Sequence, residues 1–160
     1  MNINAIIGDA GTEKTSSLNL LAYLLEKKGA KIESIKEFDR KTHLLIDITN
    51  DKDKIIGKIS DNKRGGRRTD REYILKYNDK QMLIYTAGDM RRHITEAFLE
   101  AIYNEVDILF FACRTEKDLE IVFKIFEEKY KFKHIKKEKG QDINSFVGDL
   151  ITLIDQKLKK

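Results

Sequence analysis

The sequence predicts an α/β fold: a mostly parallel sheet with helices on both faces and an extended insertion in the middle. Short apolar runs, such as residues 5–7 and 108–112, have the length and composition of buried strands. Between these runs, apolar side chains recur at spacings of three and four, which is typical of helices that pack by one face. Such alternation builds a parallel sheet covered by helices. A chain of 160 residues is expected to form a single domain over residues 1–160.

The N-terminal elements are a predicted strand, a helix and a second strand. Residues 1–7 end in the apolar run of the first strand, and residues 15–28 have the helical spacing of apolar side chains. Lys27 complements the dipole at the end of this helix, and Gly29 suits the position just past it. Residues 31–35 are then expected to form the second strand.

Residues 37–79 form the predicted insertion, which is expected to be extended and rich in β-structure. Its apolar runs are interpreted as strands at residues 44–46, 55–59 and 72–77. Between them, residues 61–70 have the composition of a polar loop. The sequence Asn78-Asp79-Lys80 predicts a hairpin turn that joins the last of these strands to another at residues 82–86.

The C-terminal half returns to regular alternation. Helices are predicted at residues 93–104, 118–130 and 143–158. The continuous apolar run at residues 108–112 predicts a strand that is covered on both faces. Residues 132–135 are interpreted as an edge strand, because the lysines there discourage pairing with a further strand.

Residues 8–15 carry the most informative motif, Gly-Asp-Ala-Gly-Thr-Glu-Lys-Thr, between a predicted strand and a predicted helix. A polyphosphate binds where backbone N–H groups converge, and the start of a helix supplies such groups together with a favourable dipole. Gly8 and Gly11 allow the chain to bend tightly around a phosphate. The segment is therefore expected to bind phosphate groups; the alternative is an ordinary turn with a solvated lysine.

The motif resembles the P-loop, or Walker A motif, of the P-loop NTPase superfamily, in which four residues separate a glycine from Gly-Lys and Ser or Thr. Gly8, Lys14 and Thr15 match this pattern, whereas Glu13 stands in place of the second glycine. The resemblance is specific over residues 3–28. The pairing of Thr86-Ala87-Gly88-Asp89 with Ala112-Cys113-Arg114-Thr115 also resembles small, uncharacterised bacterial or phage ATP-binding P-loop proteins. The resemblance to the P-loop implies that Lys14 contacts the β- and γ-phosphates and that Thr15 ligates Mg²⁺.

The resemblance implies a nucleotide site formed by the loop and the first helical turn. Its residues would be Gly8, Asp9, Ala10, Gly11, Thr12, Glu13, Lys14, Thr15 and Ser16. The implied cofactors are Mg²⁺ and a nucleoside triphosphate. ATP is favoured over GTP, because Thr115-Glu116-Lys117-Asp118 is offset by one position from the guanine-binding signature. The Glu13 carboxylate would disfavour the nucleotide by about 1 kcal/mol or more if it faced the phosphates, and would be tolerated if it pointed outward.

An acidic residue follows the strand predicted at residues 82–86. Asp89 lies where P-loop enzymes keep a carboxylate that holds Mg²⁺ through water or orients a nucleophile, so the resemblance implies this role. The alternative is a helix cap for the segment that begins near Met90. Asp47 is a weaker candidate for the metal, since Ile48 continues the apolar run past it.

Arginine is concentrated in one part of the chain. Six arginines fall between residues 64 and 92: Arg64, Arg67, Arg68, Arg71, Arg91 and Arg92. The expected catalytic set is Lys14, Asp89, Arg91, Arg92 and Arg114. Its arginines would bind phosphate in a bidentate geometry and offset the charge that develops during phosphoryl transfer. Residues 64–71 would form a lid over phosphates, a contact to a nucleic-acid backbone, or a solvated charged loop.

Composition restricts the classes of function. The single cysteine, Cys113, excludes an internal disulfide and fits a reducing compartment, so a cytoplasmic location is expected. No apolar run reaches the ~18 residues of a membrane-spanning helix, so no membrane partner is expected. The net charge of +4 permits an anionic partner.

Together these patterns predict a nucleotide-binding P-loop protein that hydrolyses or transfers the γ-phosphoryl group of ATP-Mg²⁺. If it is an enzyme, it is expected to be an NTPase or a phosphotransferase that acts on a nucleotide or another small molecule. Two alternatives stay open. The altered loop could belong to an inactive regulatory or assembly module with a protein partner or a second copy of the chain, or residues 64–71 could bind nucleic acid.

Overall fold

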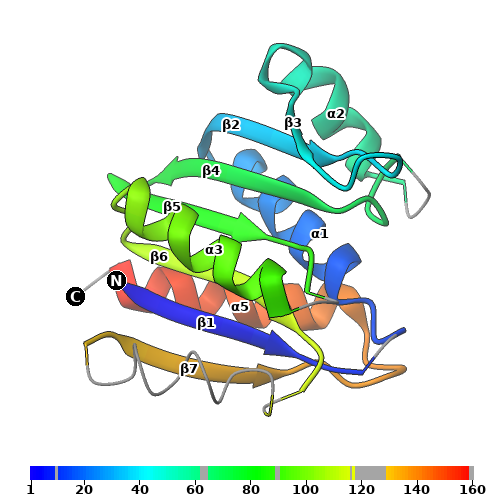
Figure 1. Ribbon diagram of the computed structural model, residues 1–160. Coiled ribbons are helices and arrows are strands. Elements are labelled where there is room, and N and C mark those ends of the chain that lie inside the picture. The colour runs from blue at the N-terminus through cyan, green and yellow to red at the C-terminus, as the bar shows by residue number, and fades with distance from the viewer. Residues whose placement is uncertain (10, 62–64, 89–90, 116, 118–128, 159–160) are drawn as a thin grey trace.

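A computed structural model describes residues 1–9, 11–61, 65–88, 91–115, 117 and 129–158, with the backbone alone at Arg91. Within this part of the chain, seven strands form one sheet (Figure 1). The strands are β1 (Asn2–Ile7), β2 (Lys31–Phe38), β3 (Leu45–Asp47), β4 (Arg71–Tyr77), β5 (Lys80–Tyr85), β6 (Ile108–Cys113) and β7 (Lys131–Lys136). Their order across the sheet is β3-β2-β4-β5-β6-β1-β7.

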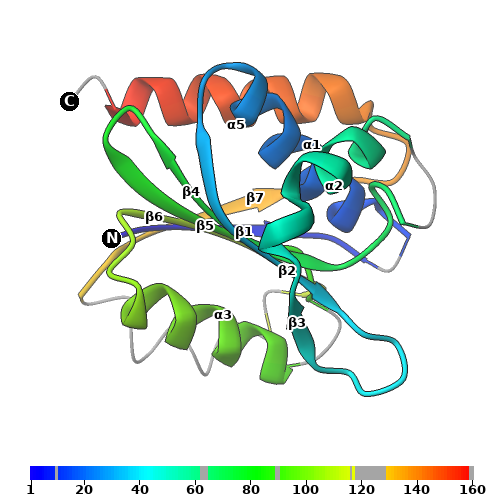
Figure 2. The same cartoon turned by 90° about the horizontal axis from the view of Figure 1, so that it is seen from above.

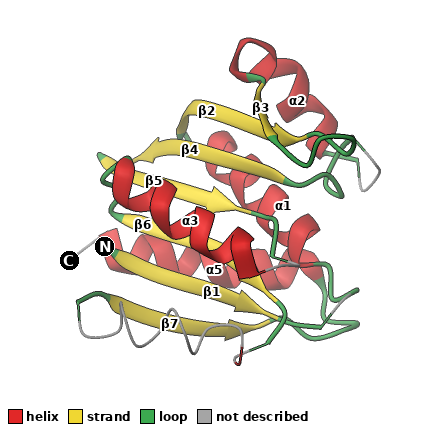
Figure 3. Ribbon diagram, in the orientation of Figure 1, coloured by secondary structure: helices red, strands yellow, loops and turns green. Residues whose placement is uncertain are grey.

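The described sheet is mixed, so the prediction of a mostly parallel sheet is wrong. The pairs β5–β6, β6–β1 and β1–β7 are parallel, whereas β3–β2, β2–β4 and β4–β5 are antiparallel (Figure 3). An apolar run has the same composition whichever way its partner runs, and the connection between two strands decides their direction. The predicted hairpin is confirmed: Asn78 and Asp79 have φ values of 48° and 62°, as a two-residue turn between antiparallel strands requires.

Helices cover both faces of the sheet. The described α-helices are α1 (Lys14–Lys27), α2 (Lys52–Ile59), α3 (Arg91–Tyr103) and α5 (Ile143–Leu158), and the 3₁₀ turn η1 (Thr49–Asp51) precedes α2. Figure 2 shows α1, α2 and α5 on one face and α3 on the other. The bounds of α1, α3 and α5 agree with the predicted helices to within two residues. The helix predicted at residues 118–130 lies outside the described residues over 118–128.

Residues 55–59 belong to α2, so the strand predicted there is wrong and the insertion is less rich in β-structure than expected. A short apolar run of this kind is compatible with a strand or with a helix face. The helix places Ile55, Ile56 and Ile59 on one face, and all three are buried in the same apolar cluster as Leu18 of α1. Tertiary packing therefore decides this element.

Apolar side chains fill a layer on each side of the sheet. Leu18 and Phe146 are buried on the side of α1 and α5, whereas Phe98 of α3 packs against Phe111 of β6 with ring centroids 5.3 Å apart. No helix in the described part of the chain combines the length and the apolar character that crossing a membrane requires.

The carboxyl ends of β1, β5 and β6 meet at one edge of the sheet, because these strands run parallel. The chain after β1 is fastened there on both sides. The N–H group of Gly8 donates to the carbonyl oxygen of Cys113 at 3.2 Å, and that of Lys137 donates to the carbonyl oxygen of Ile7 at 2.7 Å. Open α/β sheets bind ligands at this kind of edge.

Candidate phosphate-binding site

Residues 8–13 join β1 to α1 and form a tightly bent loop. A Cβ atom at Gly8 would lie 2.5 Å from the carbonyl oxygen of Lys137 and 2.5 Å from Oγ1 of Thr12, so a larger residue does not fit. Thr12 closes the bend, because its N–H and hydroxyl groups donate to the carbonyl oxygen of Asp9 at 3.2 and 2.8 Å. The backbone of the predicted phosphate loop is therefore compact.

The ammonium group of Lys14 lies inside this loop. It donates hydrogen bonds to the carbonyl oxygens of Gly8 and Asp9, the latter at 3.1 Å. Lys14 is the first residue of α1 and is only 7% exposed. Positive charge is thus held at the start of a helix, where backbone N–H groups also favour an anion.

Gly11 and Glu13 both have left-handed backbone, with φ values of 84° and 64°. Glu13 stands where the P-loop pattern has its second glycine, and this chain keeps the conformation that suits glycine. The Glu13 side chain is exposed, and its carbonyl oxygen accepts hydrogen bonds from the N–H and hydroxyl groups of Ser17 at 2.9 and 2.8 Å. Solvent screens the charge of this exposed carboxylate, but Glu13 also lines a cavity over the loop, so its charge lies beside the proposed phosphate site.

Thr15 and Asp70 meet beside the loop. The hydroxyl of Thr15 donates to Oδ1 of Asp70 at 3.1 Å, and the hydroxyl of Thr86 donates to the same oxygen at 2.9 Å. Asp70 directly precedes β4 and Thr86 directly follows β5, so the β4–β5 hairpin brings both to the edge where α1 begins. Hydroxyl and carboxylate oxygens are the kind of ligand that Mg²⁺ takes.

Asp70 is not among the predicted site residues, because it ends a segment that has the composition of a polar loop. Its position just before an apolar strand was the available signal. The predicted metal ligand Asp89 lies outside the described residues, as does Ala10 of the loop. The weaker candidate, Asp47, lies on β3, and its carboxylate accepts the N–H and hydroxyl groups of Thr49 at 2.9 and 2.6 Å. These bonds lower the pKa of Asp47 and fix its own turn.

A cavity of about 410 Å³ lies over the loop. It is lined by residues 11–16, by Thr86 and Gly88 after β5, and by Arg68 and Arg114. Its volume is within the range of small-molecule sites, roughly 300–1,000 Å³. The structure therefore brings Arg114, predicted from the sequence, next to the loop.

The other predicted residues lie nearby but apart from this cavity. Gly8 and Asp9 line an adjoining cavity together with Arg114. Arg92 is exposed and lines a neighbouring cavity on the other side, and the side chain of Arg91 is outside the described part of the structure. The predicted arginines are thus divided between different cavities.

Arg71 is a buried structural residue. It is 0% exposed, and its guanidinium group donates to the carbonyl oxygens of Gly65 and Gly66 at 2.6 Å each and to the carboxylate of Glu37 at 3.2 Å. Arg71 therefore supports the loop before β4 from the inside. Arg64, predicted in the same loop, lies outside the described residues.

Asn19 and Arg67 fasten the same loop to the helices. Asn19 of α1 donates to the carbonyl oxygens of Arg67 and Thr69 at 2.8 Å each, and Arg67 donates to the carbonyl oxygen of Ile59 at 2.8 Å. Among the described arginines of residues 64–71, Arg68 is the exposed one. Nucleic-acid binding by this loop stays a prediction. An affinity for nucleic acid that falls steeply as the salt concentration rises would support it.

One carboxyl group is buried under α3, away from the loop. Glu72 of β4 is 0% exposed, and its carboxylate lies 3.9 Å from the ammonium group of Lys36. Burial, with a smaller contribution from Glu100, raises the pKa of Glu72 to about 7, although Lys36 acts in the opposite direction. Glu72 therefore titrates near neutral pH outside the candidate site.

Comparison with known proteins identifies no relative. No family model matches the sequence, and searches of curated proteins and of solved structures found no match. Among the residues that the structure describes, no group of three or more His, Cys, Asp or Glu side chains could hold a metal ion. Mg²⁺ that binds together with phosphates needs only one or two carboxylates from the protein.

Proposed function

We propose that this protein binds a nucleoside triphosphate with Mg²⁺ at residues 8–16, and that it hydrolyses or transfers the γ-phosphoryl group. The observation that carries the proposal is the 3.1 Å hydrogen bond between Thr15 and Asp70, beside a loop that encloses the ammonium group of Lys14. It joins a hydroxyl and a carboxylate, both suited to a hard cation, at the start of a helix that suits phosphates.

The loop and its surroundings fit a chain of phosphates. Gly8 leaves no side chain in the bend, and Lys14 supplies a buried positive charge. Arg68 and Arg114 line the same cavity and offer guanidinium groups for bidentate contacts. These cations would offset the negative charge that grows on phosphate oxygens during transfer.

Thr15 and Asp70 fit a magnesium ion. Mg²⁺ takes oxygen ligands, usually one or two from the protein and the rest from phosphates and water. When bound, it neutralises charge on the β- and γ-phosphates. Asp70 orients the Thr15 hydroxyl, and the 2.9 Å hydrogen bond from Thr86 holds Asp70 in place.

The preference for ATP over GTP is part of this proposal. It rests on residues 115–118, which are offset by one position from the guanine-binding signature. The same site would serve hydrolysis or transfer, and the two differ only in whether water or a second substrate accepts the phosphoryl group.

Calorimetric titration tests nucleotide binding directly. ATP and GTP, each with Mg²⁺, would be titrated into the wild-type protein and the variants Lys14→Ala and Lys27→Ala. Lys27 is exposed in the last turn of the same helix, so it controls for the loss of one lysine. We expect Lys14→Ala to lose ATP binding and Lys27→Ala to keep it. A wild-type protein that binds neither nucleotide would overturn the proposal.

A second candidate function is a regulatory or assembly module that binds ATP without turnover. The presence of Glu13 at the position of the second glycine favours it, because a carboxylate at the loop adds negative charge beside the phosphates. Release of inorganic phosphate from ATP would be measured for wild type and Glu13→Gly. Hydrolysis by the variant alone would support the inactive module, and hydrolysis by wild type would exclude it.

A further inference from the structure

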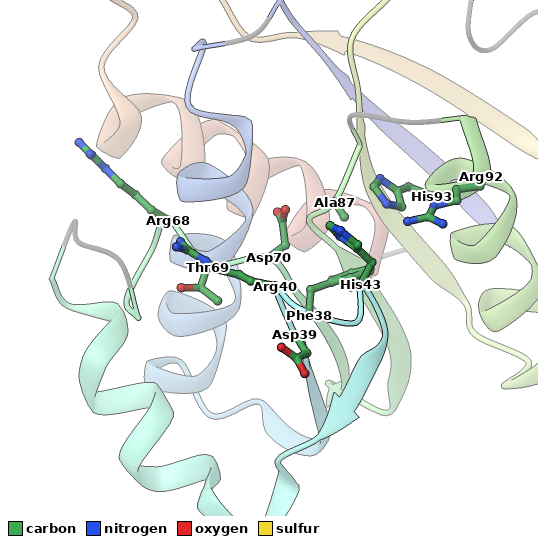
Figure 4. Close-up of a pocket in the computed structure, with 10 residues that line it drawn as sticks. All are labelled: Phe38, Asp39, Arg40, His43, Arg68, Thr69, Asp70, Ala87, Arg92 and His93. Atoms are coloured by element: carbon green, nitrogen blue, oxygen red, sulfur yellow. The ribbon is translucent and has the colours of Figure 1, made fainter.

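We propose that the larger cavity beside the phosphate loop binds a second substrate that carries a phosphomonoester group and accepts the γ-phosphoryl group. This inference rests on the proposed function. The cavity has a volume of about 730 Å³ and lies between the turn after β2, the loop before β4 and the start of α3 (Figure 4). Its walls include Arg40 and His43 from the first segment, Asp70 from the second and Arg92 from the third.

The cavity adjoins the candidate nucleotide site. Arg68 lines both cavities, and Ala87 lines this one while the preceding Thr86 lines the other. Asp70 also lines this cavity, and its carboxylate accepts the hydrogen bond from Thr15, which lines the other. A ligand in the larger cavity would therefore lie next to the two residues proposed to hold the metal.

Three arginines and two aspartates line the cavity, so its walls carry a small excess of positive charge. Arg40, Arg68 and Arg92 are exposed, and no ion pair joins any of them to another described residue. Figure 4 shows Arg40 and Arg92 on opposite sides of Asp70. A guanidinium group from either side suits an anion with several acceptor oxygens, which a phosphomonoester provides.

The two carboxylates of the cavity are already engaged. Asp39 accepts the N–H group of Lys41 at 3.0 Å and the hydroxyl of Thr42 at 3.2 Å, within its own turn. Asp70 accepts the hydroxyls of Thr15 and Thr86. These hydrogen bonds hold both carboxylates, and Arg40, Arg68 and Arg92 stay exposed to a ligand.

An aromatic wall indicates that the ligand is larger than a bare phosphate ion. The ring of Phe38 packs edge-on against Tyr85 and His93, with centroid separations of 5.9 and 5.5 Å. Phe38 and His93 both line the cavity. A wall of rings suits the sugar or base of a phosphorylated organic molecule, and the arginines suit its phosphate.

The proposed transfer balances without a further reactant. A deprotonated oxygen of the phosphomonoester forms the new bond to the γ-phosphorus. The bond from the γ-phosphorus to the bridging oxygen breaks, and its electron pair leaves with the nucleoside diphosphate. The acceptor oxygen carries no proton at neutral pH, so no general base is required.

Binding would be tested in the Lys14→Ala background, in which the loop site is disabled. AMP, ribose 5-phosphate and inorganic phosphate would each be titrated by calorimetry, which distinguishes a nucleotide, a sugar phosphate and phosphate alone as the ligand. Arg40→Gln and Arg92→Gln would be added separately to this background. Lys41→Gln is the matched control, because Lys41 is exposed in the same turn but does not line this cavity.

We expect AMP or ribose 5-phosphate to bind the Lys14→Ala protein, and Arg40→Gln or Arg92→Gln to weaken binding about tenfold or more. Lys41→Gln should leave this affinity unchanged. Arg40→Gln alone should leave the binding of ATP-Mg²⁺ unchanged. With ATP present, the wild-type protein should convert the bound phosphomonoester to the corresponding diphosphate.

Three results would overturn the inference. They are the absence of binding by both organic probes, binding that neither arginine variant weakens, and binding without conversion in the presence of ATP. If ATP-Mg²⁺ binds the wild-type protein, the failure concerns the second substrate alone. If ATP-Mg²⁺ does not bind the wild-type protein, the proposed function fails, and any remaining phosphomonoester binding cannot be that of a phosphoryl acceptor.

Discussion

The hydroxyl of Thr15 donates a 3.1 Å hydrogen bond to the carboxylate of Asp70, which lies 55 residues further along the chain. Thr15 belongs to the first turn of α1, and Asp70 directly precedes β4. The bond joins the one loop that the sequence identifies as a phosphate site to an acid that the sequence does not identify. It therefore provides the most direct test of the site.

Replacing Asp70 by Asn should weaken Mg²⁺-dependent nucleotide binding by about ten- to a hundredfold. The amide keeps an oxygen that can accept the Thr15 hydroxyl, but it removes the negative charge that a cation requires. Calorimetry with Mg²⁺ and with EDTA would separate metal-dependent from metal-independent nucleotide binding. The Asp70→Asn substitution should not lower the nucleotide affinity measured in EDTA. Asp47→Asn is the control, because Asp47 lies on β3 away from the loop. Equal effects of the two substitutions would contradict a metal role for Asp70.

Glu13→Gly should leave the protein as stable as wild type or stabilise it by up to about 1 kcal/mol. Glu13 has φ 64°, a conformation that strains any residue with a Cβ atom, whereas glycine adopts it freely. Glu13→Ala keeps the strain and removes the carboxylate, so it serves as the comparison. Urea unfolding should show the glycine variant to be the more stable of the two. Equal stability of both variants would argue against a left-handed residue at this position.

Arg71→Met should destabilise the protein by about 2–4 kcal/mol. The change leaves the carbonyl oxygens of Gly65 and Gly66 and the carboxylate of Glu37 without their donor. Arg68→Met, at an exposed position in the same loop, should change stability by no more than about 0.5 kcal/mol. The free energies of unfolding in urea would be compared. A stable Arg71→Met protein would show that this guanidinium group does not support the loop.

Stability should fall as pH rises from about 5 to about 7, because of Glu72. The folded protein keeps this carboxyl protonated up to a pKa of about 7, whereas the unfolded chain releases the proton near its usual value of 4.5. The contribution of Glu72 to the free energy of unfolding is therefore fully present below pH 4.5 and is lost as pH rises through 7. The loss is about 3 kcal/mol by linkage.

Glu72→Gln should remove this dependence and be more stable than wild type at pH 8. Glu100→Gln should move the wild-type transition to lower pH, since Glu100 contributes to the raised pKa of Glu72. Unfolding in urea at pH 5, 6, 7 and 8 would give the three profiles. Parallel profiles for wild type and Glu72→Gln would rule out this carboxyl as the source of the pH dependence.

Periodicity located most elements of the fold but not the direction of the strands. The helices α1, α3 and α5 have apolar side chains along one face over several turns, so their positions could be predicted. The short apolar runs of β2 and β4 do not indicate whether the neighbouring strand is parallel or antiparallel. In α2, one helical face of three isoleucines resembles a strand when it is read without its neighbours.

In the candidate site, the residues that lie close together in sequence could be predicted, whereas those brought together by tertiary contacts could not. Gly8, Lys14 and Thr15 are close in sequence, and one motif identifies them together. Asp70 reaches Thr15 only because β4 and β5 form an antiparallel hairpin, and no local pattern encodes that arrangement. The buried role of Arg71 is likewise a property of its tertiary contacts, since its sequence neighbours suggest a solvated basic loop.

The β4–β5 hairpin has one end in the site and the other far from it. At the open end, two hydrogen bonds join Arg71 and Thr86. The N–H group of Thr86 donates to the Arg71 carbonyl oxygen at 3.0 Å, and the N–H group of Arg71 donates to the side-chain hydroxyl of Thr86 at 2.9 Å. At the closed end, Asn78 and Asp79 form an exposed turn about 20 Å away along the strands. That turn is therefore a suitable place to insert a peptide tag or attach a fluorophore, because such an addition leaves Asp70 and Thr86 undisturbed.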